Sequence, residues 1–490
     1  MCSLIDGIEN SLSEIFTENG AKTYSTSLSS LVDFFALGAS MRTRSTKEKV
    51  LLFSKAMSDN KLLAMKALFY IRDCRGGQGE RTFFRDCFSW LANNYPEIAV
   101  KNFDNVVKFG RFDDLFVLRK TAVENEMVNY IRKAWRQDVE AFKRVEPISL
   151  LAKWMPSENA SKKETVNLAR WFIRKLKISN RNYRKTLSIL RKQIDIVEVK
   201  MSKNAWNSIE YEKIPSYAAK NYRAAFGKHD GERYSAYLEK VKAGKTKIHS
   251  STLYPYDLLK AYLQPGWGSF FNTKVDPTIE AQWNALPDYF DGRTENSLCV
   301  VDTSGSMSGI PICVAVSLGL YTAERNKGLF KDCFISFSAR PQLHRVKGET
   351  LLEKARNMSQ TNWDMNTNLE AVFNVILEAA IQNKVPRTKM VKKIYIISDM
   401  EFDRCVRNQT LYSSFTRKFK QANFEVPEVV FWNVSARNNN LPVRFNEQGV
   451  ALVSGMSPAI FETVVGRKIT NPLDVMLNII NKQRYNTVVI

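Results

Sequence analysis

Residues 298–306 have the sequence LCVVDTSGS, in which four apolar residues lead into a loop of small residues with oxygen-bearing side chains. The apolar run is typical of a buried strand, and the loop carries Asp302, Ser304 and Ser306 at alternate positions. A looped backbone can turn all three side chains toward one cation, and Mg²⁺ prefers oxygen ligands in near-octahedral geometry. The stretch therefore predicts a divalent-cation site at the end of a strand.

Two loops further along the chain can complete this set of ligands. The apolar run at 394–397 leads into Ser398 and Asp399, and Thr367 stands at the start of a helix expected over 366–383. Ligands in open α/β sheets bind beyond the carboxyl ends of the strands, where both aspartates fall. The predicted metal ligands are Asp302, Ser304, Ser306, Thr367 and Asp399.

The pattern around these loops alternates between strands and helices. Strands are expected at 297–302, 332–338, 342–346, 393–399, 428–434 and 449–453, and helices at 310–325, 366–383, 409–422, 457–465 and 471–484. Strands that are apolar on both faces and alternate with helices predict a parallel, doubly wound α/β sheet.

The order of these loops resembles the metal-ion-dependent adhesion site (MIDAS) of von Willebrand factor A domains, and the resemblance covers residues 291–490. It implies a Rossmann-like A domain that holds one divalent cation, usually Mg²⁺, partly through water. No histidine accompanies the serines and no GxxxxGK[ST] motif is present, so the sequence does not predict an enzyme. A metal-dependent nuclease is the enzyme alternative, but two-metal hydrolysis normally uses denser carboxylate clusters.

Residues 1–290 have the pattern of a mostly helical domain. Apolar residues recur at helical spacing over 47–71, and a second helix is expected over 82–94. The glycine-rich segment 75–79 (RGGQG) between them is interpreted as a helix–helix turn, with phosphate contact as the alternative. Repeated helix–turn–helix units predict an α-solenoid, which a connector at 264–290 (QPGWG at its start) joins to the second domain.

Composition limits the class of protein. The chain has 490 residues, of which 44% are hydrophobic and 25% charged, values typical of soluble globular proteins with two or three domains. No run of 18 apolar residues predicts a membrane helix, and the acidic start does not resemble a secretion signal. Seven scattered cysteines without a CxxC pair predict free thiols in a reducing compartment, so we expect a cytoplasmic protein.

The charge of the chain is strongly positive and unevenly distributed. The net charge is +22, and residues 151–260 alone hold 24 lysines and arginines against 10 aspartates and glutamates, a net charge of +14. Such clustering favours a polyanionic partner, most commonly a nucleic acid, over a basic surface that only aids solubility.

RNA binding needs cations for phosphates and flat surfaces for exposed bases, and this basic region supplies both. Cations recur at helical spacing from Arg170 to Arg184 and are expected to share one helical face, and Trp171, Tyr183, Trp206 and Tyr217 interleave with the basic residues. Any one of these aromatic residues is more often part of a core than a stacking surface. The candidate RNA-binding residues are Arg170, Arg174, Lys175, Lys177, Arg181, Arg184, Lys185, Lys220, Arg223, Lys245, Lys247 and His249.

A helical array followed by an A domain resembles the Ro autoantigen family, whose TROVE module is a ring of HEAT-like helical repeats. The match is more specific to a less characterised Ro-like family, through the segments NGA at 19–21, LFYIRD at 68–73, GRFDDL at 110–115, KNYRAAF at 220–226 and KIH at 247–249. The resemblance implies a non-enzymatic ribonucleoprotein component that acts as a monomer, binds small structured or misfolded RNAs on a basic outer surface and passes single-stranded ends through the ring.

Two other functions stay open at this point. The chain could be a protein-interaction module whose metal site captures an acidic group of a partner, as integrin-type A domains do. It could also be a structural component of a larger particle in which the solenoid acts as a scaffold. The sequence does not identify the RNA or decide whether the metal regulates RNA binding.

Overall fold

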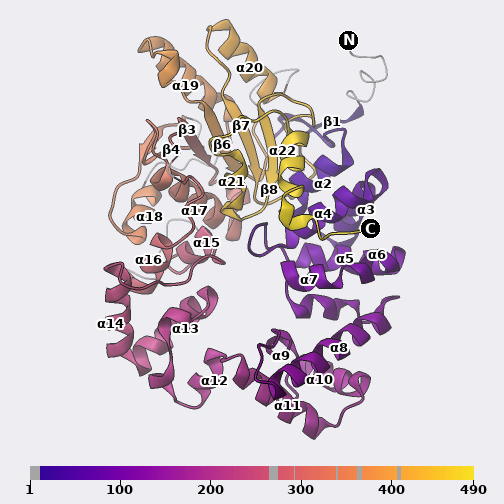
Figure 1. Ribbon diagram of the computed structural model, residues 1–490. Coiled ribbons are helices and arrows are strands. Elements are labelled where there is room, and N and C mark those ends of the chain that lie inside the picture. The colour runs from indigo at the N-terminus through magenta and orange to yellow at the C-terminus, as the bar shows by residue number, and fades with distance from the viewer. Residues whose placement is uncertain (1–11, 264–273, 292, 338–339, 361–366, 405–409) are drawn as a thin grey trace.

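The computed structural model describes residues 12–263, 274–291, 293–337, 340–360, 367–404 and 410–490. A helical half is followed by a domain built on one sheet, as the sequence predicts (Figure 1). Within the described ranges, no helix is both long enough and apolar enough to cross a membrane. The cysteines described there are free thiols, as expected (Cys74, Cys87, Cys299, Cys313 and Cys333), whereas Cys2 and Cys405 lie outside the described residues.

The helical half begins with a short hairpin of β1 (Glu14–Phe16) and β2 (Lys22–Tyr24), which the sequence did not predict. Its helices are α2 (Ser30–Gly38), α3 (Thr46–Asp59), α4 (Lys61–Arg72), α5 (Thr82–Asn94), α6 (Pro96–Lys101), α7 (Phe103–Phe109), α8 (Glu124–Lys143), α9 (Leu151–Trp154), α10 (Lys163–Leu176), α11 (Asn180–Gln193), α12 (Val197–Ser202), α13 (Ser216–His229), α14 (Gly231–Lys242), α15 (Pro255–Leu259) and α16 (Pro277–Asn284). Residues 264–268 of the predicted connector lie outside the described residues.

Two predictions are wrong: one continuous helix over 47–71, and one helical face shared by the cations from Arg170 to Arg184. The helix expected over 47–71 is divided at Asn60, whose backbone is extended and whose side chain accepts a hydrogen bond from the Leu63 amide (3.0 Å) to cap α4. The basic stripe is divided between α10 and α11, because Lys177 adopts a left-handed backbone (φ +57°) and Ser179 caps α11. The predicted RNA-binding cations from Arg170 to Lys185 therefore lie on two helices and at the junction between them, not along one helical face.

The C-terminal half is a six-stranded sheet with strand order β5-β4-β3-β6-β7-β8. Its strands are β3 (Ser297–Val301), β4 (Cys333–Ser336), β5 (Leu343–Arg345), β6 (Lys393–Ser398), β7 (Glu428–Asn433) and β8 (Val450–Ser454). Its helices are α17 (Ile310–Arg325), α18 (Leu351–Ser359), α19 (Leu369–Gln382), α20 (Leu411–Gln421), α21 (Phe461–Val464) and α22 (Pro472–Ile480). Helix α18 was not predicted from the sequence.

The prediction of a parallel sheet holds for β3, β4, β6, β7 and β8 and is wrong for β5, which pairs antiparallel with β4. Six residues separate β4 from β5, too few for the crossover that a parallel partner requires. β3 and β6 lie next to each other in the middle of the sheet, with Val301 level with Ile397. Their carboxyl ends therefore place Asp302 and Asp399 at the same edge.

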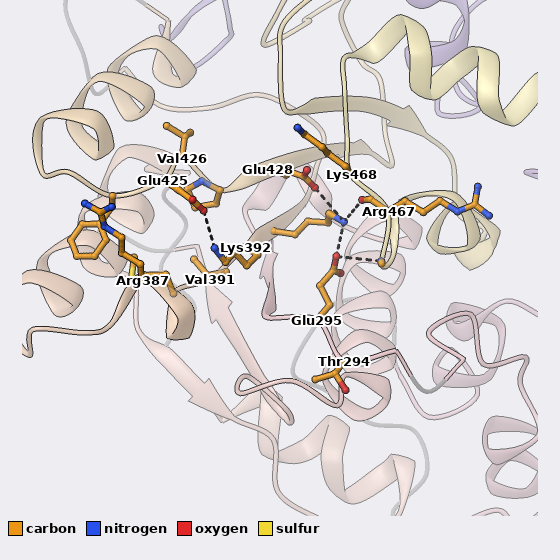
Figure 2. Close-up of a pocket in the computed structure, with 15 residues that line it drawn as sticks. Thr294, Glu295, Arg387, Val391, Lys392, Glu425, Val426, Glu428, Arg467 and Lys468 are labelled. Atoms are coloured by element: carbon orange, nitrogen blue, oxygen red, sulfur yellow. Dashed lines mark hydrogen bonds and ion pairs between the residues drawn. The ribbon is translucent and has the colours of Figure 1, made fainter.

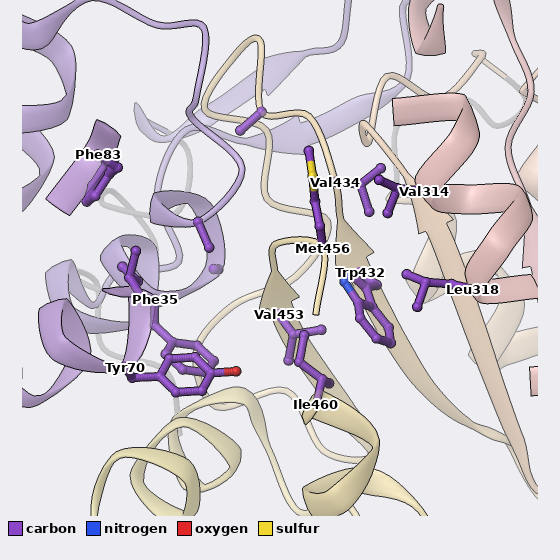
Figure 3. Packing of buried hydrophobic residues seen from close by; sticks show 14 of the residues in the cluster. Phe35, Tyr70, Phe83, Val314, Leu318, Trp432, Val434, Val453, Met456 and Ile460 are labelled. Carbon is purple, nitrogen blue, oxygen red and sulfur yellow. The ribbon is translucent and has the colours of Figure 1, made fainter. Parts of the chain in front are cut away.

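The first of the helices given above, α2, packs against the last strand of the sheet domain, β8, and one hydrophobic cluster extends through both halves (Figure 3). The Ser454 hydroxyl donates to the carbonyl of Phe35 (2.8 Å) and accepts from the Ala39 amide (3.3 Å). Burial of apolar surface stabilises such a junction by about 25 cal/mol for each Å² removed from water. Helix α2 is thus part of the hydrophobic core of the sheet domain.

The RGGQG segment is the turn between α4 and α5, as predicted, and it packs against the sheet domain. Gln78 is buried: its amide nitrogen donates to the Tyr70 hydroxyl (2.7 Å) and its amide oxygen accepts from the Ser457 amide (3.2 Å). A Cβ at Gly455 would lie 2.2 Å from that amide oxygen, and Gly455 has a positive φ of +109°. Glycine at 455 is therefore required by this close approach.

The helices form an arc that leaves the sheet domain at α2 and returns to it where α15 packs against α17 (Figure 1). Most of the arc shares the main hydrophobic cluster. The segment from α12 to α14 has a smaller cluster of its own, built around Phe226, Tyr211 and Tyr234. This basic segment is therefore packed mainly on itself.

A buried aspartate ties the end of the chain to the helical half. Asp73 is fully buried, accepts from the Tyr485 hydroxyl (3.0 Å) and pairs with Arg484 Nε (2.6 Å). We predict that Asp73→Ala lowers the free energy of unfolding by about 2 to 4 kcal/mol, because it leaves the partners of a buried charge unpaired. Tyr485→Phe removes one hydrogen bond and should cost about 1 kcal/mol.

Urea denaturation followed by circular dichroism measures both changes. Equal midpoints for Asp73→Ala and the unaltered protein would show that the contact does not hold the chain end in place.

Candidate functional site

The carboxyl edge of the sheet holds two buried aspartates. Asp302 accepts hydrogen bonds from the Ser398 hydroxyl (2.5 Å) and from the Ser304 amide (2.9 Å). The Oγ atoms of Ser304 and Ser306 lie 3.0 Å apart in hydrogen-bond contact. Asp399 Oδ1 accepts from the amide of Glu401 (3.2 Å). The predicted DxSxS loop is thus folded inward, against the end of the neighbouring strand.

The two carboxylates affect each other's ionisation. Burial, followed by the charge of Asp399, raises the pKa of Asp302 to about 6. Burial also raises the pKa of Asp399, while a hydrogen bond from Ser306 lowers it. Asp399 Oδ2 is buried and has no hydrogen-bond partner among the described residues. Two adjacent buried carboxylates, hydroxyl donors and an unpartnered carboxylate oxygen are a donor set that fits a hard divalent cation.

Thr367 lies at the same edge but in a different network of hydrogen bonds. Its hydroxyl contacts the carbonyl of Glu401 (3.0 Å) and a carboxylate oxygen of Asp403 (2.9 Å), and its amide donates to the other oxygen of Asp403 (2.7 Å). Of the five predicted ligands, the described contacts connect Asp302, Ser304, Ser306 and Asp399, and they place Thr367 against the loop that follows Asp399. Asp403 was not predicted from the sequence.

The tip of the β1–β2 hairpin covers this edge. The Asn19 side-chain amide donates to the Glu401 carbonyl (2.7 Å) and to the Thr367 hydroxyl (3.2 Å). The Glu18 amide donates to the carboxylate of Glu401 (2.8 Å). The NGA segment at 19–21 was visible in the sequence, but its contact with residues more than 340 positions away is set by the tertiary fold.

The candidate metal site depends on hydroxyl groups as much as on acids. In the part of the chain that the structure describes, no group of three or more His, Cys, Asp or Glu side chains is arranged to hold a metal ion. Two carboxylates with serine and threonine oxygens form a weaker donor set than a carboxylate cluster. Such a set suits a cation that keeps part of its water shell, as Mg²⁺ does.

A cavity of about 920 Å³ lies on the helical half. Its walls come from the α4–α5 turn, α9, the segment before and along α12, and residues near Tyr217 and Tyr254. The cationic side chains that line it are Arg42, Arg72, Arg75, Arg81, Arg111, Lys153, Lys200 and Lys213, and the acidic ones are Glu80, Asp195, Glu198 and Glu210. Cations therefore outnumber acids in its lining by two to one.

Several of these cations are neutralised by ion pairs, but Arg81 is not. Arg42 pairs with Glu80, and Arg72 pairs with the buried Asp114. Among the described residues no carboxylate forms an ion pair with Arg81. Burial, followed by the positive charges of Arg111 and Arg85, lowers the pKa of Arg81. The cavity thus has a positive potential that an anion would relieve.

An aromatic ring lies beside these cations. The Arg111 guanidinium stacks over the ring of Trp154 at 4.0 Å from the centroid, and Lys153 Nζ lies 5.6 Å from the same centroid. Trp154 is half-buried, so one part of the ring remains accessible. A cation–aromatic pair of this kind is a surface on which a nucleobase can stack.

The RNA-binding residues predicted on α10 and α11 are mostly exposed. Arg170 and Arg184 both approach Glu158, at 4.0 and 2.7 Å, so the two helices present their cations on a common surface. Lys175 is half-buried and pairs with Glu124 at 2.6 Å. The side chains of Arg170, Arg174, Lys177, Arg181, Arg184 and Lys185 are exposed.

The predicted residues further along the chain divide into two groups. Lys220 and Arg223 are half-buried and pair with Asp257 (3.7 Å) and Asp276 (2.6 Å), where they help to hold α13 against the segment that returns to the sheet domain. Lys245, Lys247 and His249 follow α14 and are exposed.

Of the interleaved aromatic residues, Tyr183 is fully buried and stacks on Trp135, so it belongs to the core. Within the described ranges, none of the twelve predicted RNA-binding residues lines the 920 Å³ cavity.

A second cavity, of about 410 Å³, lies at the opposite, amino-terminal edge of the sheet (Figure 2). Lys393 is buried there and its Nζ contacts Glu295 (2.6 Å), Glu428 (3.4 Å) and the carbonyl of Arg467 (3.0 Å). Lys392 at the rim pairs with Glu425 (2.8 Å). Because the buried lysine is fully paired, this cluster serves to connect the starts of β6 and β7 with the segment after α21.

Both halves of the chain are similar in sequence to known proteins. The family described as domain of unknown function DUF2828 matches residues 17–139 and 132–290, and domain of unknown function DUF7788 matches 296–483. The relative named "Uncharacterized protein L728", from Acanthamoeba polyphaga mimivirus, is 30% identical over 97% of this chain and 88% of its own length.

A crystal structure of the Ro (RSR) protein of Deinococcus radiodurans aligns with 93% of this chain and 99% of its own, at 14% identity and a TM-score of 0.37. The match over most of the helical half and the full-length similarity to the mimivirus protein establish that the chain belongs to the DUF2828 family.

Proposed function

We propose that this protein is a non-enzymatic RNA-binding protein of the Ro type, whose helical arc acts as a ring that holds small structured or misfolded RNAs. The observation that carries the proposal is the cavity of about 920 Å³, in which Arg81 has no acidic partner and lies with Arg111 and Trp154. Phosphates supply the missing negative charge, and an unpaired base supplies the flat surface that stacks on the ring.

The cavity and the exposed helices have different parts in this proposal. The cavity combines cations with an aromatic ring, which suits a single strand with unstacked bases. The exposed cations on α10 and α11 lie on a common surface, which suits the phosphates of a structured RNA. One RNA with a folded part and a single-stranded end could contact both.

The proposal includes a Mg²⁺ ion at the carboxyl edge of the sheet. Asp302, Ser304, Ser306 and Asp399 would hold it, with Thr367 contributing through the adjacent loop. When bound, the ion would neutralise the two carboxylates and offer a coordination position to a further ligand. The residues themselves keep the site assembled, because Ser398 and the backbone of Ser304 orient Asp302 without the ion.

A protein-interaction role is the second candidate function. It is favoured by one observation, the buried Asp399 Oδ2, which accepts no hydrogen bond from any residue that the structure describes. A metal at this oxygen could capture an acidic group of a partner, but the tip of the β1–β2 hairpin already occupies part of this edge. A partner would therefore have to approach beside the hairpin or displace it.

We predict that Arg81→Gln weakens binding of a single-stranded RNA oligonucleotide and makes it less dependent on salt. Each lost phosphate contact should reduce the slope of log affinity against log salt by about 0.7. Fluorescence anisotropy over a series of KCl concentrations measures the slope. Arg387→Gln, which removes an exposed arginine at the second cavity, is the matched control and should leave the slope unchanged. RNA binding that does not vary with salt would contradict the proposal.

Trp154→Ala should weaken binding of the same oligonucleotide by about 1 to 3 kcal/mol, because the stacking of one base on an aromatic ring contributes this much binding free energy. Trp154→Phe keeps a ring and should retain most of the affinity. The comparison uses the anisotropy assay at one salt concentration, with circular dichroism to show that both variants are folded. Equal affinities of the alanine variant and the unaltered protein would place the RNA elsewhere.

We predict that the protein binds one Mn²⁺ or Mg²⁺ ion and that Asp302→Asn abolishes this binding. Ligand at 100 times its Kd should stabilise the unaltered protein by about 2.7 kcal/mol and leave the variant unaffected. Isothermal titration calorimetry and thermal denaturation with and without Mn²⁺ provide the two measurements. Asp59→Asn, at an exposed carboxylate of α3, is the control. The same Mn²⁺ affinity in Asp302→Asn would exclude this edge as the metal site.

A further inference from the structure

One arginine lies between the candidate metal site and the N-terminal hairpin. Arg437 Nη2 donates to Glu18 Oε2 (2.6 Å), and Arg437 Nε lies 3.4 Å from Asp399 Oδ2. The side chain of Asp399 is fully buried, and neither Arg437 Nε nor Asp399 Oδ2 has a hydrogen-bond partner within the described residues. Arg437 thus makes a close ion pair with Glu18 and only a loose one with Asp399.

A divalent cation and Arg437 cannot both sit close to Asp399 Oδ2. The cation carries twice the charge of the guanidinium and would repel it at short range, more strongly than in water because the site is buried. The guanidinium has another acceptor within reach, since Glu18 already binds its Nη2. The other oxygen of Glu18 accepts a hydrogen bond from the side-chain amide of Asn438 (2.9 Å), which keeps the carboxylate in place.

Building on the proposed metal site, we propose that Arg437 competes with the divalent cation for Asp399 and that Glu18 draws the arginine away when the cation binds. Binding of the cation is thereby linked to docking of the N-terminal hairpin, because Arg437 then forms an ion pair with Glu18 of the hairpin alone. In the absence of the cation, the arginine is shared between the two carboxylates and the hairpin is held less tightly.

The hairpin is built to transmit this change. Its tip contacts two of the three loops of the site, because the Asn19 side-chain amide donates to the Thr367 hydroxyl (3.2 Å) and the Asn19 carbonyl accepts from the Arg404 backbone amide (3.0 Å). Its second strand pairs with the sheet domain, since Tyr24 and Leu441 exchange backbone hydrogen bonds of 3.1 and 2.9 Å. The hairpin is followed directly by α2, which packs on β8. A change in its docking therefore reaches the junction where the helical arc begins.

The test compares Mn²⁺ affinities of the full chain by isothermal titration calorimetry. Arg437→Gln removes the competing charge and should tighten Mn²⁺ binding by about 3- to 10-fold. Glu18→Gln leaves the arginine on Asp399 and should weaken binding by a similar factor. In the double variant the effect of Glu18→Gln should largely disappear, because its route through Arg437 is gone. Lys392→Gln, an exposed paired lysine at the opposite edge, should change nothing.

Amide hydrogen exchange gives a second measurement. If Glu18 and Arg437 had only a structural role, Mn²⁺ would not change the exchange rates of the hairpin. Mn²⁺ should slow amide exchange in residues 14–24 of the unaltered protein and have a smaller effect in Glu18→Gln. If the unaltered protein binds no Mn²⁺ that Asp302→Asn removes, the metal site and this linkage are both wrong. If Mn²⁺ binds at that site but Arg437→Gln leaves its affinity unchanged or lower, the metal site stands and the competition is wrong. Exchange in residues 14–24 that is indifferent to Mn²⁺ contradicts the hairpin link.

Discussion

The packing of α2 on β8 is the contact on which the rest of this structure depends. It joins residues 419 positions apart through the hydrogen bond between the Ser454 hydroxyl and the Phe35 carbonyl, within a shared apolar core. Closing so long a segment costs little more conformational entropy than closing one half its length, so a well-packed junction suffices to hold the arc of helices in place. The buried pairing of Asp73 with the chain end reinforces the same closure.

The closed fold gathers positive charge at one place and negative charge at another. On the helical half, cations from segments far apart in the sequence line one cavity, and among the described residues Arg81 has no acidic partner in an ion pair. At the sheet edge, two buried carboxylates lie together, and one of their oxygens accepts no hydrogen bond from the residues that the structure describes. Each arrangement costs free energy in the isolated protein, and each is relieved by a ligand of opposite charge. Unsatisfied charge of this kind is more common at functional sites than elsewhere in a fold.

Much of the sheet domain could be predicted from the sequence because its signals are local. An apolar run followed by DTSGS requires only neighbouring residues to indicate a strand that ends in a polar loop. The direction of β5 and the break at Asn60 were missed because both depend on short-range backbone geometry that apolar periodicity does not report. The hairpin tip on the metal loops was missed for the opposite reason, since it depends on contacts between distant residues.

The candidate RNA-binding site shows the same limit. Charge density drew attention to the helices around Arg170 and Arg184, which are indeed exposed, whereas the cavity draws single cations from several separate segments. The RGGQG turn carried a local signal, because Arg75 begins it, Arg81 follows it and both line the cavity. Gly76 packs close to Arg484, and Gly77 and Gly79 pack close to Tyr70 and Tyr254 of the helical half. Phosphate contact through Arg75 and Arg81 is therefore compatible with a structural turn.

The most direct test of RNA binding in the cavity is ultraviolet cross-linking of the full chain to a single-stranded RNA, followed by mass spectrometry of the cross-linked peptides. Cross-links are expected on the peptide that contains Trp154 and on the peptides that contain Tyr217 and Tyr254, residues that line the same cavity. Cross-links confined to the sheet domain, or to α10 and α11 without the cavity, would contradict RNA binding in the cavity.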